Sequence, residues 1–535
     1  MSPPVGTSAG QAPASGGGSW APLRRPVFRA LWTAQAASLV GTWAQTVGAQ
    51  WFLTTESGRP ELVALVQTAT SLPVLLLALP AGVLADLVDR RRVLVGVQGL
   101  MALVAVALAA VTLGGLLTPG GLLAFTAVFG VGVALTAPAW QASVPELVPR
   151  GELPAAAALN GIAVNAARAV GPAVGGLLVA GAGVGWTFAL NAVSYVTFAV
   201  ALFLWRPDPV RHRHEGERLA GAMRVAVGYI RNAPAMRRVL ARAALWVLPG
   251  SALWALLPLV AADRLGLGSE GYGVLLGSLG VGAVGSVAFL GRLRARLSSS
   301  QVVGVTGVAY AGATAVLAVG RSTPLAVLVL LVAGGAWISL LSTVNATAQL
   351  ILPAWVRARA LATYLLVFQG GQAVGATAWG VLAGATSTEV ALLAAAALTL
   401  AGAATVPWVR LPDPALIDPA PSAHWPEPHL LLDPATAEGP VLVVVEYRVA
   451  EADVPAFVAA MEYVARSRRR LGARRWGLHR DGADPTRIVE SYQVASWAEH
   501  LRQHDERLTV GDRHREEAVA ALLLEPPKAS HLFTV

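Results

Sequence analysis

The stretch LVPRGELPAAAALNGIAVNAARAVGPAVGG (residues 147–176) lines up with ILPAWVRARALATYLLVFQGGQAVGATAWG (residues 351–380), 204 residues further along the chain. A looser pair, PVFRALW from residue 26 and PAMRRVL from residue 234, has nearly the same offset, 208 residues. Both members of the long pair contain apolar runs of the length that a helix needs to cross a bilayer. The sequence therefore predicts a duplicated unit that is built from membrane helices.

The composition agrees with a membrane protein. Of the 535 residues, 55% are hydrophobic and 13% are charged, whereas about a quarter are charged in a soluble domain. The chain has no cysteine, which excludes disulfides, thiolate metal sites and cysteine nucleophiles. The net charge of +9 is divided, because residues 1–410 carry +14 and residues 411–535 carry −5. The basic excess belongs to the apolar part, so we expect no nucleic-acid partner.

Twelve apolar segments follow one another between Phe28 and Trp408, each of about 20 residues. They lie near 29–53, 62–87, 93–116, 120–142, 155–181, 184–205, 239–262, 271–291, 301–320, 324–350, 359–384 and 387–408. The loops on one side hold 22 Arg and those on the other side hold three. Positively charged loops stay in the cytosol, so both termini are predicted to be cytosolic. Arg supplies 39 of the 40 basic residues, a bias typical of GC-rich bacteria, and we predict a bacterial inner-membrane protein.

The same pattern divides the chain into domains. We expect a disordered tail over 1–22, a six-helix bundle over 23–205, a cytosolic loop over 206–238, a second six-helix bundle over 239–408, a Pro-rich linker over 409–440 and a cytosolic domain over 441–535. In the last of these, strand and helix patterns alternate as β-α-β-β-α-β, the ferredoxin-like order. The predicted fold class is an all-α polytopic membrane protein with twelve transmembrane helices in two six-helix repeats, plus a small C-terminal ferredoxin-like α+β domain.

A charged motif, GVLADLVDRRRVL (residues 82–94), joins the second and third segments. Gly82 permits close helix approach, and Asp86 can pair with a basic group or a helix N-terminus and so hold a gate in one state. Asp89 also belongs to this candidate gate, and the three basic residues that follow it set the topology and contact anionic lipid heads: Arg90, Arg91 and Arg92. The corresponding stretch of the second half, GRLRARLSSSQVV from residue 291, has Ala295 in place of the aspartate.

The fifth segment contains AARAVGPAVGG (residues 166–176). Its small residues allow backbone contact with a neighbouring helix, and its proline removes a helical hydrogen bond: Gly171, Pro172, Gly175 and Gly176. Arg168 lies about 21 Å along the helix from Pro154. At that depth an arginine needs a wet cavity or a partner, so it is a candidate to bind an anionic substrate or to bias a protonation site. Hydrogen bonding to backbone carbonyls is the structural alternative.

Amides, hydroxyls and aromatic rings make up the remaining polar groups of the segments. Candidate substrate contacts, each of which can equally serve as interhelical contacts, are Gln45, Asn165, Asn345, Tyr364 and Gln372. Such a lining suits a bulky, partly aromatic, hydrogen-bonding compound. No Asp or Glu lies in the middle of a segment, so the sequence displays no carrier for a coupling proton.

The C-terminal domain offers little chemistry from sequence alone. His500 and His504 lie one helical turn apart, but no third ligand is evident, and we expect a solvated helix face rather than a metal site. Six arginines that lie close together in the sequence are expected to be solvated or to face lipid: Arg466, Arg468, Arg469, Arg470, Arg474 and Arg475. No acid, base or nucleophile constellation stands out, so we expect no catalytic residues and no cofactor.

Together these features resemble the major facilitator superfamily, and within it the enterobactin-exporter-like branch of transmembrane secretion effectors. The loop motif is similar to the superfamily signature Gly-x-x-x-Asp-x-x-Gly-Arg-Arg, with Asp89 where Gly is usual, and Gly-Pro-x-x-Gly-Gly resembles the helix-5 motif of drug and proton antiporters. The segment from Gly439 resembles the antibiotic-biosynthesis-monooxygenase-like dimeric α+β barrels. The resemblance implies export of a siderophore, natural product or drug-like compound by alternating access, proton coupling, and a homodimer through the C-terminal domain. Uptake by the same fold, and a membrane-tethered enzyme whose C-terminal domain oxidises an aromatic substrate, are the alternatives.

Overall fold

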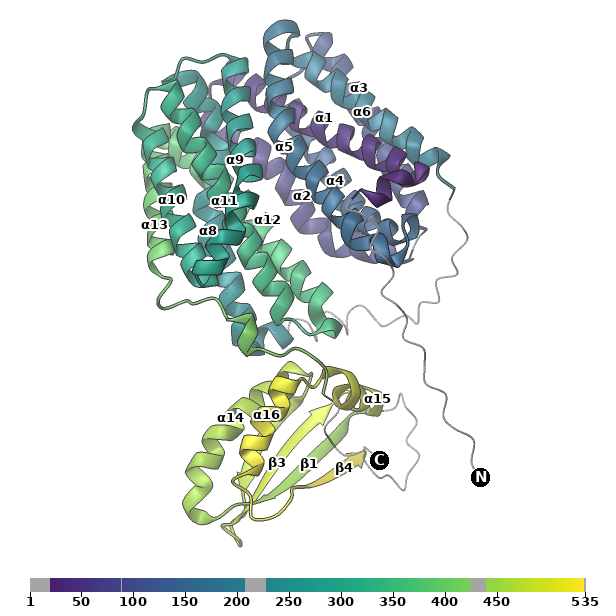
Figure 1. Ribbon diagram of the computed structural model, residues 1–535, viewed down its shortest axis with the longest axis vertical. Helices are drawn as coiled ribbons and strands as arrows, with labels where there is room; N and C mark the ends of the chain where they lie inside the picture. Colours follow the sequence, from purple (N-terminus) through teal and green to yellow (C-terminus); the bar gives the residue numbers. More distant parts are fainter. Residues whose placement is uncertain (1–19, 88, 207–227, 423–424, 426–438, 534–535) are drawn as a thin grey trace.

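The computed structural model describes residues 20–87, 89–206, 228–422, 425 and 439–533. Its described residues form twelve long helices in one bundle, with a smaller α+β domain beneath it (Figure 1). The bundle helices are α1 (Pro26–Ser57), α2 (Pro60–Leu87), α3 (Arg90–Leu113), α4 (Pro119–Leu147), α5 (Leu153–Ala182), α6 (Val184–Leu204), α8 (Pro234–Leu259), α9 (Ser269–Arg296), α10 (Ser299–Val319), α11 (Thr323–Ile351), α12 (Ala354–Ala385) and α13 (Thr388–Ala404). These twelve helices coincide with the twelve predicted segments.

Nine of the described helices are long and apolar enough to cross a membrane, and the bent α9 makes a tenth. The remaining two fall short for evident reasons. α13 has 17 residues, and α1 has a polar stripe that includes Gln45 and Gln50. The helix ends follow local rules: α1 starts with proline at its first position and stops at Gly58, whose φ of 59° suits glycine.

The packing pattern of the first six helices recurs in the second six. α1 packs against α5 and α6, α2 against α4, and α3 against α4 and α6. In the second half α8 packs against α12 and α13, α9 against α11, and α10 against α11 and α13. Each helix of the second half therefore has neighbours equivalent to those of its counterpart in the first half, with α8 corresponding to α1 and α13 to α6. This is the architecture that the internal repeat predicts.

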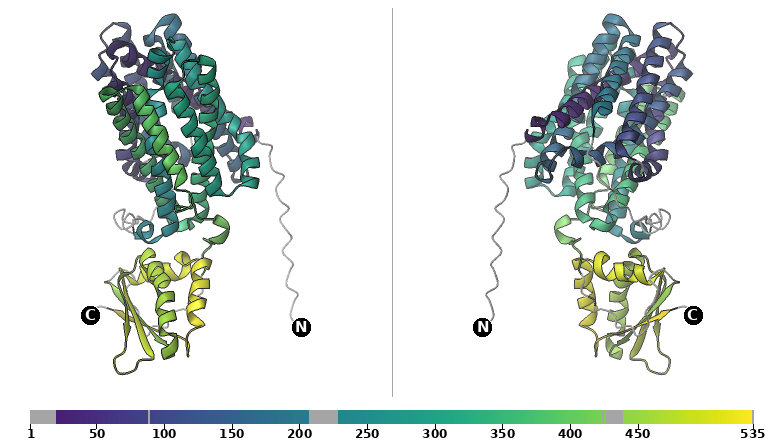
Figure 2. Two further views of the ribbon diagram at one scale, coloured as in Figure 1. Left: turned by 90° about the vertical axis from the view of Figure 1, so that its left-hand side faces the viewer. Right: turned by 90° about the vertical axis from the view of Figure 1, so that its right-hand side faces the viewer.

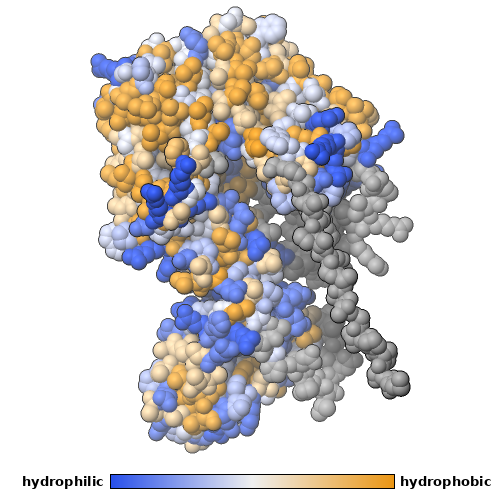
Figure 3. Space-filling view, viewed as in Figure 1, coloured by the Kyte–Doolittle hydropathy of each residue, from blue (hydrophilic) through white to orange (hydrophobic). Residues whose placement is uncertain are grey.

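The outer surface of the bundle is apolar. Orange, hydrophobic residues cover most of it, whereas blue residues gather at the lower end of the bundle and over the α+β domain (Figure 3). Large side chains such as Leu103, Leu116 and Phe289 are more than 65% exposed. Apolar patches of this extent do not face water in a soluble protein, so this surface is the one that contacts lipid.

The C-terminal domain contains β1 (Val441–Arg448), α14 (Val454–Arg470), β2 (Arg474–Arg480), β3 (Arg487–Val494), α15 (Trp497–Arg502), α16 (Val510–Ala520) and β4 (Lys528–Phe533). The strands form an antiparallel sheet in the order β2-β3-β1-β4, with α14 and α16 against one face (Figure 2). The β-α-β-β-α-β order agrees with the prediction. The second helix is interrupted, however, because a π-helical turn, Gln503–Arg507, separates α15 from α16.

The C-terminal domain docks on the lower end of the bundle. Two cation–π contacts join them: the Arg507 guanidinium carbon lies 4.8 Å from the ring centre of Trp355 at the start of α12, and that of Arg470 lies 5.7 Å from Tyr229. The two rings also meet each other edge to face. The linker is fixed to the domain as well, because Ser422 donates its amide hydrogen to the carbonyl oxygen of Leu508 (2.8 Å).

Replacing Trp355 by alanine should loosen this docking. The Arg507 contact is worth about 1 kcal/mol, so amide hydrogen exchange of Gln503–Arg507 should accelerate about fivefold. Hydrogen–deuterium exchange with mass spectrometry measures the effect, and Trp408→Ala, at a ring that is 79% exposed, is the matched control. Equal exchange in both variants would show that Trp355 does not hold the domain.

Candidate functional site

The two halves of the bundle meet along two symmetric helix pairs, α5 with α9 and α2 with α12. The α5–α9 contact depends on glycine. A methyl group at Gly176 would lie 2.6 Å from the carbonyl oxygen of Ser269 and 2.9 Å from the Cα atom of Gly273, and one at Gly273 would lie 2.7 Å from the Pro172 carbonyl oxygen. The backbones therefore touch at a distance that excludes any side chain at these two positions.

Hydrogen bonds between described residues of the two halves lie at one end of the bundle. Thr68 and Thr377 share a hydrogen bond of 2.9 Å, Gln67 donates to Gln372 (3.2 Å), and Tyr272 and Gln50 are bonded. α8 and α12 both begin next to the docked C-terminal domain, so these bonds lie in the parts of the helices farther from it. We call this the distal end. The halves are closed there.

The glycines of the helix-5 motif divide their contacts between two helices. Gly171 and Gly175 face α1 of the same half, where a methyl group would lie 2.5 Å from the Trp43 Cβ atom and 2.7 Å from the Ala44 carbonyl oxygen. Gly176 faces α9 of the other half. The motif thus joins α5 simultaneously to its own half and to the opposite one, with Pro172 buried between them.

Arg168 lies eight residues before Gly176, about 12 Å nearer the C-terminal domain. Its guanidinium carbon lies 5.6 Å from the ring centre of Trp43. Its Nε and Nη1 atoms are buried and have no hydrogen-bond partner among the described residues. Aromatic rings continue from Trp43 into the second half through Trp254 and Trp337, at centre-to-centre distances of 6.1 and 5.7 Å. A cation with free donors beside a row of aromatic rings is suited to bind an aromatic anion.

The other predicted contacts are placed differently. Gln45 accepts a hydrogen bond from Asn191 of α6 (2.5 Å), and Asn165 donates to the Gly161 carbonyl oxygen of its own helix (2.9 Å). Asn345 accepts from Gln349. Gln372 belongs to the contacts that close the distal end, and Tyr364 is buried in the second half. The structure therefore does not gather these five residues into one group around Arg168.

The charged loop motif connects helices within the first half. Asp89 caps α3 by accepting from the Arg92 amide (2.8 Å). Arg90 forms an ion pair with Glu146 of α4 (2.8 Å), and Arg91 donates to the Phe203 carbonyl oxygen of α6 (2.6 Å). The surroundings of Gly82 and the side chain of Asp86 lie outside what the structure describes.

A second intramembrane arginine, Arg242 of α8, contrasts with Arg168. It is 2% exposed and donates to the carbonyl oxygens of Gly402 in the last turn of α13, of Thr405 at its C-cap and of Val409 in the segment that follows. It therefore neutralises the negative end of that helix and satisfies its free carbonyls. The sequence placed Arg242 at a segment edge and gave no sign of this role.

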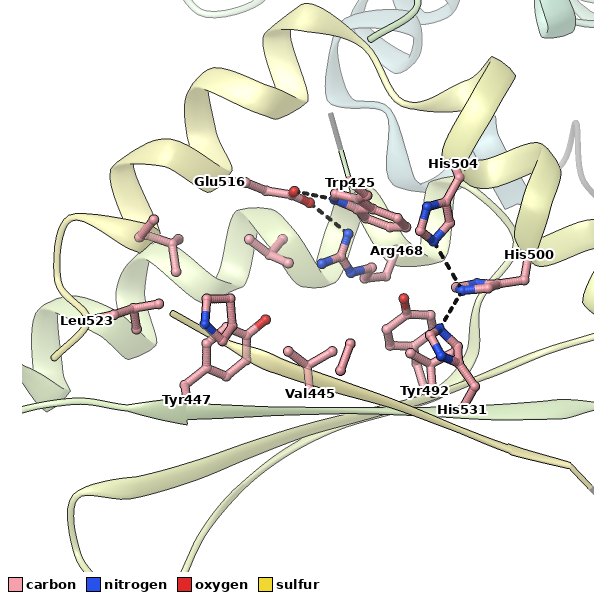
Figure 4. Close-up of a pocket in the computed structure, with 16 residues that line it drawn as sticks. Trp425, Val445, Tyr447, Arg468, Tyr492, His500, His504, Glu516, Leu523 and His531 are labelled. Atoms are coloured by element: carbon pink, nitrogen blue, oxygen red, sulfur yellow. Dashed lines mark hydrogen bonds and ion pairs between the residues drawn. The ribbon is translucent and has the colours of Figure 1, made fainter. Parts of the chain in front are cut away.

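The C-terminal domain encloses a cavity of about 440 Å³ between its sheet and its helices (Figure 4). Trp425 of the linker covers it, donating to Glu516 (2.6 Å) and stacking 4.4 Å from the Arg468 guanidinium. Two expectations were wrong here. His500 and His504 are 1% and 9% exposed rather than solvated, and Arg468, at 6%, is buried between Glu490 and Glu516.

The sequence also missed the third member of the histidine cluster, His531. It lies on β4, which the sheet brings beside α15, so only tertiary structure makes the three side chains neighbours. The signal that was available is the direction of His531 on a strand whose alternate residues face the helices. Burial and the neighbouring imidazoles lower the pKa of His500 to about 3 and that of His504 to about 4, so both rings are neutral at pH 7.

Comparison of the chain with known protein families shows which family it belongs to. The family described as "Transmembrane secretion effector" matches residues 17–534. The chain belongs to this family. It is thus a membrane transporter of the major facilitator type, as the resemblance predicted. The staphyloferrin A transporter of Staphylococcus aureus is 24% identical over 246 residues, which are 46% of this chain and 62% of that protein. The match spans less than two thirds of that relative's length.

Two solved structures show the same fold. A variant of the nucleoside transporter NupG is similar over 71% of this chain and 98% of its own, with a TM-score of 0.60 and 14% identity. A bacterial homologue of the human lysosomal transporter Spinster, in an inward-facing and occupied conformation, is similar over 72% and 97%, with a TM-score of 0.60 and 14% identity.

The two buried arginines should respond differently to the same substitution. Arg242→Gln removes charge-assisted hydrogen bonds and should destabilise the protein by about 2 kcal/mol, seen as a lower Tm in detergent. Arg168→Gln should leave Tm unchanged but reduce transport of aromatic anions about tenfold, because a cation is lost at the site. Transport is measured with the reconstituted protein. If Arg168→Gln lowers Tm and leaves transport intact, Arg168 is structural.

Two glycines of α5 provide a second matched pair. Gly176→Ala should force α5 and α9 apart and lower Tm, because backbone atoms meet the new methyl group. In Gly161→Ala the new methyl group lies in open space. Alanine is more favourable than glycine inside a helix by about 0.5–1 kcal/mol, so Tm should stay the same or rise. Equal values of Tm for the two variants would contradict the close contact between the halves.

Proposed function

We propose that this protein exports a siderophore, natural product or drug-like compound across a bacterial inner membrane by alternating access. The observation that carries the proposal is the guanidinium of Arg168, which lies beside Trp43 between the closed distal end and the C-terminal domain and has two donors without a partner among the described residues. A substrate with an acidic group and an aromatic ring meets both the cation and the rings that continue into the second half.

Two further observations support the choice of substrate and direction. The related staphyloferrin A transporter moves a siderophore, by its name, and the family is described as one of secretion. With 22 Arg on the side of the C-terminal domain, that side is the cytosol by the positive-inside rule. Closure at the distal end then makes the present conformation one that loads substrate from the cytosol.

Coupling to protons is part of the proposal, since the helix-5 motif resembles that of proton antiporters. The helices carry no central carboxylate in the sequence, so the coupling group lies elsewhere. The candidates that we propose are Asp86 and Asp89 of the loop motif, because this motif lies at the end where substrate enters.

The test begins with purified protein. Thermal stabilisation by a panel of siderophores, staphyloferrin A included, and aromatic antibiotics identifies a ligand. Inside-out vesicles should then accumulate that ligand when a proton gradient is imposed, and Arg168→Gln vesicles should accumulate about tenfold less. Accumulation by right-side-out vesicles instead would establish uptake, and accumulation without a gradient would exclude proton coupling.

The homodimer through the C-terminal domain stays a prediction. The helices cover one face of the sheet, and the other face presents Leu442 and Leu532, 37% and 52% exposed, on paired strands. An ion pair between Glu446 and Arg487 (2.8 Å) lies on the same face. This mixture of apolar and charged groups is compatible with pairing of two copies.

A further inference from the structure

Three histidines meet at one end of the cavity in the C-terminal domain (Figure 4). The Nε2 atom of His500 lies 2.9 Å from that of His531 and 3.2 Å from that of His504. One ligand atom from each of the three lies within 4.8 Å of the others. They come from α15, the π-helical turn and β4, so three separate elements direct their imidazoles to one point.

Protons alone do not satisfy this arrangement. A ring nitrogen of imidazole carries either one proton or one lone pair in the ring plane, so it forms one good hydrogen bond. The Nε2 atom of His500 faces two other nitrogens at hydrogen-bond distance. Whichever tautomer it adopts, one of the two contacts lacks a properly shared proton. An electron-pair acceptor placed among the three nitrogens would satisfy all of them at once.

The geometry is close to that of a metal site. Zn–N bonds of about 2.0–2.1 Å in a tetrahedron place the ligand nitrogens about 3.3 Å apart, against the 2.9 and 3.2 Å found for two of the pairs. Three neutral imidazoles favour first-row transition metals, whereas Mg²⁺ and Ca²⁺ require oxygen ligands.

We propose that His500, His504 and His531 bind one divalent first-row transition metal ion, such as Zn²⁺, with an open coordination position toward the cavity. Structural zinc sites use four protein ligands, whereas sites with three ligands leave a position for a further molecule. Here that position opens on a cavity of about 440 Å³, a volume that holds a small organic ligand. Val443, Val445 and Tyr492 supply apolar walls, and the ion pair of Arg468 with Glu516 supplies polar groups.

The experiment uses the full-length protein in detergent, purified through a tag without histidine and stripped with a chelator. Titration with Co²⁺ alone should give the visible absorption of a four-coordinate ion, saturating at one Co²⁺ per chain, and one equivalent of Zn²⁺ should abolish it. His531→Gln should weaken Zn²⁺ binding at least about 100-fold, measured by competition with a chromophoric chelator. His479→Gln, at an exposed histidine of the same domain, should bind as the parent does.

A second test of the metal site uses the parent protein and needs no variant. X-ray absorption of its Zn²⁺-loaded form should show three imidazole ligands. Fewer than three, no Co²⁺ absorption in the parent, or equal losses in His479→Gln and His531→Gln would each overturn the proposal. Circular dichroism confirms that each variant is folded, and if His531→Gln unfolds, the parent spectra stand as the test. None of these measurements depends on transport, so their outcome is independent of the exporter proposal.

Discussion

A polar side chain inside a bilayer has no water to bind, and this constraint explains how the bundle is organised. Hydroxyls such as Thr42 donate to the carbonyl oxygen four residues earlier, the amides of Gln45 and Asn191 pair, and Arg242 is satisfied by the carbonyls that end α13. Other buried polar atoms of the bundle, such as Nε1 of Trp254, also lack a partner among the described residues, but Arg168 differs from them because it is charged and two of its donors are unpartnered. Groups that the fold leaves unsatisfied at such a cost are the natural place for a substrate.

The same constraint determines how the halves can move. The contacts that the structure describes between the halves are uncharged: glycine backbones of α5 and α9, amide and hydroxyl bonds of α2 with α12, and the bond between Tyr272 and Gln50. These contacts can break and re-form during a movement of the halves without exposing a charged side chain to lipid. The docked C-terminal domain contacts Trp355 at the start of α12, so it lies against a helix that would tilt in the proposed opening of the distal end.

The helices were largely predictable because a bilayer imposes a length and a composition on every segment, and the duplicated stretches at 147 and 351 predicted the repeated packing. The functional site was less predictable from the sequence. Local patterns identified Arg168 and the helix-5 glycines, whereas Trp43 and Trp254 are neighbours only through packing between halves. In the C-terminal domain, the basic stretch and the two histidines of one helix read as solvated, since burial of Arg468 and His500 depends on partners that lie 22 and 31 residues away in the chain.

Alternating access requires the distal end to open in each transport cycle, and the absence of cysteine from the chain allows a direct test. The hydroxyls of Thr68 and Thr377 lie 2.9 Å apart across the halves, so Thr68→Cys with Thr377→Cys should form a disulfide on oxidation. Transport by reconstituted protein should stop when this bond forms and return on reduction, while Thr68→Cys alone should be insensitive to oxidant. Transport at the parent rate by the fully cross-linked protein would contradict alternating access between these two halves.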